Sequence, residues 1–100
     1  MHNLAQESRQ PALKPLIELG RREHRAITAE TYAPWLDPLP DAQRTRVLDA
    51  LVLATDLYTW KLVRRDMGRS IQETRTIIRG LVDAILADAP RFATSGNDPP

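Results

Sequence analysis

The chain has 100 residues, which is enough for one small domain. Lysine and arginine number 14, and aspartate and glutamate number 13, a near-balance that argues against a dedicated nucleic-acid-binding protein. Because cysteine is absent, the sequence excludes a disulfide framework, a thiolate nucleophile and a cysteine metal site.

The two ends of the chain lack hydrophobic periodicity. Residues 1–11 are polar, without the basic segment and apolar run of a secretory signal, and they predict a mobile arm. Residues 89–100 (APRFATSGNDPP) are rich in Pro, Gly, Ser and Asn, and they predict a disordered tail. No stretch has the apolar length that spans a membrane. We therefore expect one helical domain over residues 12–88, in the cytoplasm.

The first predicted element is an amphipathic helix from Leu13 to Thr31, where apolar residues recur at three- and four-residue spacing. His24 lies on its apolar face. This histidine is either partly buried and held by a hydrogen bond, or a polar anchor in the wall of an effector pocket. A metal site would need further ligands at suitable spacing, and Glu23 falls elsewhere on the helix. We expect neither a metal nor a cofactor.

The second predicted element is a long helix from Asp41, a plausible N-cap, to Met67. It follows a segment with three prolines, YAPWLDPLPD, that a regular helix cannot cross. Apolar residues occupy two faces, and a helix that is apolar nearly all round is normally buried all round. Since one small chain cannot cover both faces, we expect a second copy to do so. The second face comprises Ala50, Leu53, Leu57 and Trp60.

Two aspartates of this helix, Asp49 and Asp56, are seven residues apart. Paired carboxylates can do acid–base chemistry, but no third group supports that function here. We expect ion pairing with an arginine of a neighbouring helix instead. There is also no glycine-rich phosphate loop and no nucleophile–base constellation, so we do not expect an enzyme.

The third predicted element is a helix over residues 71–88. Ser70 and Glu73 form a capping-box pattern at its start, and Gly68 suits the left-handed residue after the preceding helix. A short connection makes neighbouring helices antiparallel, so we predict a hairpin of the last two helices. Arg64 and Arg65 would complement the dipole at the preceding helix end. The alternative is a phosphate-contacting basic patch.

The segment LDALVLATDLYTWKLVRRDMGRSIQETRTIIRGLVDAIL, residues 48–86, resembles the last two helices of bacterial TetR/AcrR-type transcriptional regulators. Residues 58–68 (YTWKLVRRDMG) carry most of the resemblance, and residues 20–36 are similar to the preceding helix of some members. The resemblance covers about two thirds of the chain. It implies an all-helical C-terminal domain that binds a small effector and dimerises through a four-helix bundle made from its last two helices.

Nothing in the sequence resembles the N-terminal helix-turn-helix head of that family. We therefore expect no direct nucleic-acid binding by this chain alone. The leading hypothesis is an all-α regulatory domain of three main helices that forms a homodimer and binds a small apolar effector. The alternative is a ligand-free interaction module that pairs with itself or with a full-length regulator.

Candidate site residues follow from the helix faces. The predicted effector pocket lies between the first helix and the hairpin and contains His24, Ile27, Thr28, Thr55, Tyr58 and Thr59. The predicted dimer interface contains Leu53, Leu57, Trp60, Ile77, Leu81, Ala84 and Ile85.

Overall fold

The structure, a computed structural model, describes residues 13–92, and all regular secondary structure in that range is helical. The predicted all-α class is therefore confirmed. The predicted arm, and residues 93–100 of the predicted tail, lie outside the described residues. Three long helices, α2 (Leu13–Thr31), α4 (Asp41–Thr55) and α6 (Ile71–Ala87), are joined by shorter ones: α3 (Ala33–Leu36), α5 (Leu57–Lys61), the π-helix η1 (Leu62–Asp66) and α7 (Ala89–Phe92).

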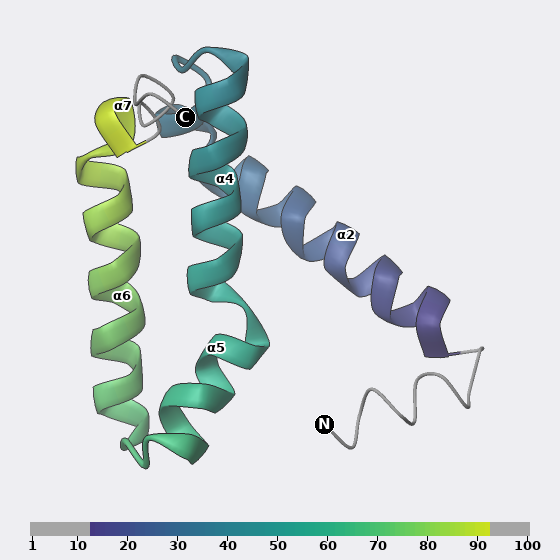
Figure 1. The fold of residues 1–100 in the computed structure, drawn as a ribbon, viewed down its shortest axis with the longest axis vertical. Helices are drawn as coiled ribbons and strands as arrows, with labels where there is room; N and C mark the ends of the chain where they lie inside the picture. The colour runs from purple at the N-terminus through teal and green to yellow at the C-terminus, as the bar shows by residue number, and fades with distance from the viewer. Residues whose placement is uncertain (1–12, 93–100) are drawn as a thin grey trace, which may run out of the picture.

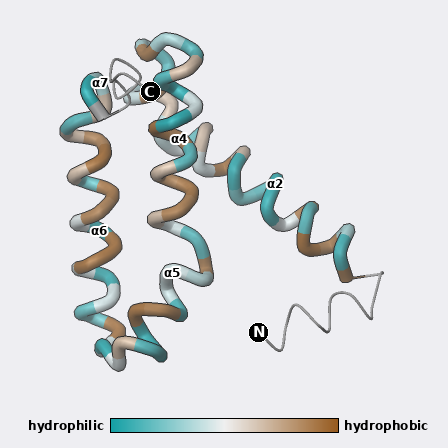
Figure 2. The backbone as a smooth tube through the Cα atoms, in the orientation of Figure 1, coloured by the Kyte–Doolittle hydropathy of each residue, from teal (hydrophilic) through white to brown (hydrophobic). Residues whose placement is uncertain are grey.

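Helices α4 and α6 lie side by side and antiparallel, while α5 bends away from the end of α4 toward the start of α6 (Figure 1). The C-terminal half of α2 contacts α4, whereas its N-terminal half slants away from the α4–α6 pair (Figure 1). Hydrophobic residues recur along α4 and α6, whereas α2 is mostly hydrophilic (Figure 2). The pairing of α4 with α6 is thus the centre of the fold, and α2 is attached to one side of it.

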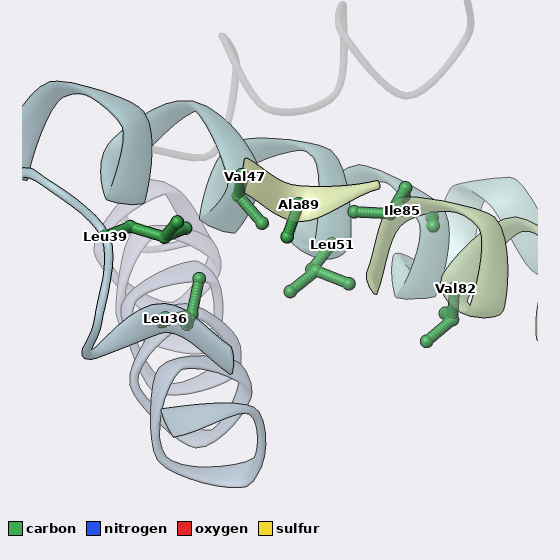
Figure 3. Close-up of a cluster of buried hydrophobic side chains, with 8 residues drawn as sticks. Leu36, Leu39, Val47, Leu51, Val82, Ile85 and Ala89 are labelled. Carbon is green, nitrogen blue, oxygen red and sulfur yellow. The ribbon is translucent and has the colours of Figure 1, made fainter. Parts of the chain in front are cut away.

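The buried core lies at the end of the molecule where α3, α4, α6 and α7 meet (Figure 3). Val47 and Leu51 of α4 are fully buried there. Ala89, in the part of the predicted tail that the structure describes, belongs to α7 and is only 2% exposed. The short helix α7 therefore helps to close the core. The other members are Leu36, Leu39, Ala54, Val82 and Ile85.

The proline-rich connection between α3 and α4 is held by one arginine. The guanidinium of Arg44 donates hydrogen bonds to the carbonyl oxygens of Leu36 (3.1 Å) and Leu39 (2.7 Å). It also pairs with the Asp41 carboxylate at 3.0 Å. The predicted N-cap function of Asp41 is wrong, because Pro40 is the N-cap and Asp41 begins the helix. Arg44 thus joins carbonyl oxygens on both sides of Pro38 in a connection where the prolines contribute no N–H donor.

The single helix predicted from Asp41 to Met67 is interrupted at Asp56. This residue has an extended backbone (φ −67°, ψ 147°), and its carboxylate accepts a hydrogen bond from the Tyr58 N–H at 2.8 Å. Aspartate is a preferred N-cap because its oxygen satisfies an N–H that the first helical turn leaves free. Asp56 therefore ends α4 and starts α5, and the helix phase shifts between Thr55 and Leu57.

The turn into α6 follows the predicted pattern. Gly68 has a positive φ of 70°, which glycine adopts at no steric cost. The Ser70 hydroxyl accepts a hydrogen bond from the Glu73 N–H at 3.0 Å, as its N-cap function requires. Ahead of the turn, the Met67 N–H reaches the Leu62 carbonyl oxygen, a five-residue π-helical spacing. The hairpin of the last two segments is thus built as predicted, although its first arm is not one continuous helix.

Candidate binding groove

A groove with a volume of about 950 Å³ opens between α2, α5 and α6. Its lining follows α6 from Arg75, near the start of that helix, to Leu86, in the last turn before α7. In Figure 1, α5 bends toward α6 beside the first part of this path. This volume is at the upper end of the range of about 300–1,000 Å³ for small-molecule sites. The break at Asp56 helps to form the groove, because it turns α5 away from the line of α4 (Figure 1).

Most of the groove wall is apolar. Trp60 and Leu57 come from α5, and Ile78, Val82 and Leu86 follow one another along α6 at helical spacing. Leu57 is 63% exposed, so its apolar surface is not covered by the rest of the chain. A wall of this kind would release ordered water when it binds an apolar molecule. Ile17, Gly20, Tyr32 and Tyr58 complete it.

A histidine and a threonine place polar groups in the same wall. The Thr55 hydroxyl donates to the Leu51 carbonyl oxygen at 2.8 Å, and it lies 3.0 Å from the Nε2 atom of His24. Since that hydroxyl hydrogen is already engaged, Nε2 is the donor in the second contact and Thr55 the acceptor. Nε2 is also 3.4 Å from the Val52 carbonyl oxygen. The pair links α2 to α4 and holds the imidazole in a fixed orientation.

The charged residues of the groove are three arginines and two aspartates. Arg75 and Arg79 are four residues apart on α6, and Arg21 of α2 also lines the groove. None of these three guanidinium groups makes an ion pair or hydrogen bond within residues 13–92. Of the aspartates, Asp56 is engaged as the N-cap of α5. Three arginines and two aspartates give the groove lining a net charge of +1, which favours an anionic ligand.

Three of the six predicted pocket residues, His24, Thr55 and Tyr58, line the groove. The other three do not. Ile27 is 62% exposed, and Thr28 is buried and donates a hydrogen bond to the His24 carbonyl oxygen. The Thr59 hydroxyl donates instead to the Leu53 carbonyl oxygen, across the break at Asp56.

The residues predicted for the dimer interface are spread over four environments. Leu53, Leu81 and Ala84 are exposed. Ile85 belongs to the buried core of the single chain. Leu57 and Trp60 line the groove, because the phase shift at Asp56 rotates α5 relative to α4. Ile77 is half-buried.

The two aspartates of the predicted second helix have different functions in the structure. Asp49 forms an ion pair of 2.7 Å with Arg25 of α2, as the pairing hypothesis expects. Asp56 caps α5. Sequence reasoning missed Arg75 and Arg79, because their four-residue spacing places them on one helix face without indicating which helices lie opposite.

No cluster of three or more histidine, cysteine, aspartate or glutamate side chains among residues 13–92 could hold a metal ion. Nor does any helix there have the length and apolar character needed to cross a membrane. In comparisons with known proteins, no family model matches the chain, and no curated protein or solved structure shows significant similarity to it.

Proposed function

We propose that this chain is a non-catalytic regulatory domain that binds a small, mostly apolar effector in the groove between α2, α5 and α6. One observation carries the binding proposal, namely an open groove of about 950 Å³ whose wall is mainly apolar. A few oriented polar groups in such a wall, like those of His24 and Thr55, are typical of small-molecule sites. The regulatory function is suggested by the resemblance of residues 48–86 to TetR/AcrR-type regulators.

The neutral dye N-phenyl-1-naphthylamine tests the binding proposal, because it is small and apolar and its fluorescence rises in apolar sites. The sequence has two tryptophans, Trp35 and Trp60, and Trp60 alone lines the groove. In a Trp35→Phe background we expect saturable dye binding with energy transfer from Trp60. A dye that fails to bind, or that binds without involving Trp60, would contradict the proposal.

Dimerisation is the second part of the proposal. Leu53 is 72% exposed and Leu81 is 45% exposed, so these side chains leave apolar area for another copy of the chain. Light scattering over a range of concentrations should give twice the mass of the chain. We expect Leu53→Glu to shift that mass toward the monomer. Leu16→Glu is the matched control, since Leu16 is 62% exposed on α2, away from the proposed interface.

The competing function is a ligand-free interaction module, which the same exposed leucines favour. It differs from the first proposal in one measurable respect, because it needs the dimer but not the dye site. A dimer that binds no N-phenyl-1-naphthylamine would support the module. Dye binding by either monomer or dimer would support the effector-binding domain.

A further inference from the structure

The arginines of the groove point to the class of molecule that it binds. Arg75 and Arg79 are one helical turn apart on α6, at a Cβ separation of about 5–6 Å. Like charges at this spacing destabilise a helix slightly unless an anion lies between them. Neither guanidinium forms an ion pair or hydrogen bond within residues 13–92. The groove wall therefore carries two neighbouring cationic donors that no described side chain satisfies.

The charges are distributed unevenly along the groove. Arg75 and Arg79 occupy the half of α6 nearer its start, next to Ile78, while Val82 and Leu86 extend the wall toward the other end. A molecule lying along α6 would thus meet charge at one end and apolar surface over the rest. Arg21 of α2 adds a third guanidinium to the lining.

The acidic residues of the groove do not cancel this pattern. The Asp56 carboxylate accepts a hydrogen bond from the Tyr58 N–H and is committed to capping α5. Asp83 lies one turn beyond Arg79 on α6, but the two side chains do not form an ion pair. Because a guanidinium can bind a carboxylate, sulfonate or phosphate through two parallel hydrogen bonds, Arg75 and Arg79 suit a single acidic group.

We propose that the groove binds an amphipathic anion, with its acidic group between Arg75 and Arg79 and its apolar body along Ile78, Val82 and Leu86. This inference rests on the proposed function, since it assigns a ligand class to the same groove. The aryl or alkyl body would supply most of the affinity by burying apolar area. The two arginines would select acids over neutral molecules of the same shape.

A matched pair of dyes tests the proposal. N-phenyl-1-naphthylamine and 8-anilino-1-naphthalenesulfonate share one skeleton and differ by a sulfonate. Both are titrated into the wild-type chain, the double variant Arg75→Gln/Arg79→Gln, and the control Arg65→Gln/Arg69→Gln. The control removes the same charge from two exposed arginines outside the groove lining.

We expect Arg75→Gln/Arg79→Gln to weaken sulfonate binding about fivefold to tenfold. It should change binding of the neutral dye by less than about twofold, which also shows that the groove is intact. The control variant should leave both affinities within about twofold of the wild type. Added salt should weaken sulfonate binding and not neutral-dye binding.

The failures of the two proposals are distinguishable. The anion proposal would be overturned if Arg75→Gln/Arg79→Gln left sulfonate affinity unchanged, or if the control variant lowered it equally. Binding of the neutral dye would still support the groove in that case. If the neutral dye does not bind but the sulfonate binds through Arg75 and Arg79, the anion site stands and the apolar-effector proposal falls. If neither dye binds the wild type, both proposals are wrong.

Discussion

The two ends of the α4–α6 pair differ in how their apolar residues are used. At the α7 end, Val47 and Leu51 have no exposed surface, and Arg44 ties the incoming connection to the core. At the α5 end, Leu57 is 63% exposed in the wall of an open groove, and Leu62 of η1 is 46% exposed outside that wall. The contrast indicates that most of the buried core lies at the α7 end, whereas the α5 end buries Val63 but leaves more apolar surface exposed.

The largest expected effect comes from truncating a leucine at the α7 end, and the same truncation at the α5 end provides the comparison. Leu51→Ala removes a fully buried side chain and should lower the free energy of unfolding by about 2–5 kcal/mol. Leu57→Ala should lower it by less than about 0.5 kcal/mol, because its side chain is mostly exposed. Urea unfolding followed by circular dichroism measures both. Equal losses in the two variants would mean that the α5 end is as tightly packed as the core.

Removal of the arginine that holds the proline-rich connection should have an intermediate effect. Arg44→Met keeps most of the side-chain length but loses the hydrogen bonds to the Leu36 and Leu39 carbonyl oxygens. We expect a loss of about 2 kcal/mol, typical of hydrogen bonds from a charged donor. Arg65→Met, at an exposed arginine of η1, is a control for the loss of one positive charge. A loss no greater than that of the control would show that the connection is held mainly by its apolar residues.

The smallest expected effect comes from a substitution at Gly20, which should raise stability and weaken dye binding. Gly20 lines the groove, and a Cβ atom built there would meet no atom within 4 Å outside its own stretch of helix. Gly20→Leu should therefore raise the free energy of unfolding by about 0.5–1 kcal/mol through helix propensity. It should also weaken N-phenyl-1-naphthylamine binding by filling the groove.

Gly80→Leu provides the matched comparison in α6. Gly80 is equally unobstructed but is not part of the groove lining. This variant should gain similar stability and keep the wild-type dye affinity. If Gly20→Leu binds the dye as tightly as Gly80→Leu does, the dye site lies elsewhere.

Much of the fold could be predicted from local patterns. The amphipathic periodicity of residues 13–31, the Gly68 turn and the Ser70 cap each depend on neighbours in sequence, and all three are present in the structure. The break at Asp56 could not be read in the same way. An aspartate between apolar residues fits both a helix interior and an N-cap, and the periodicity on either side favours a continuous helix.

The break at Asp56 is the main reason why the predicted positions of the α5 side chains differ from the structure. With a continuous helix, Leu57 and Trp60 continue the face of Leu53, whereas the shift at Asp56 turns them into the groove. Arg75 and Arg79 were also hidden, because exposed arginines on a helix usually interact only with solvent. Their significance depends on which helices face them, and the sequence does not specify that arrangement.

The central claim is that the α7 end is tightly packed and the α5 end holds the dye-binding groove. Hydrogen exchange measured with and without saturating N-phenyl-1-naphthylamine tests this claim most directly, because it reports local stability along the backbone. Without the dye, amides of α5 and η1 should exchange faster than those of α4 from Arg44 to Thr55. With the dye, we expect slower exchange in α5, in α6 around Ile78 and in α2 around Gly20, and little change around Val47. Equally slow exchange at both ends in the free chain, or dye protection confined to the α7 end, would contradict the account.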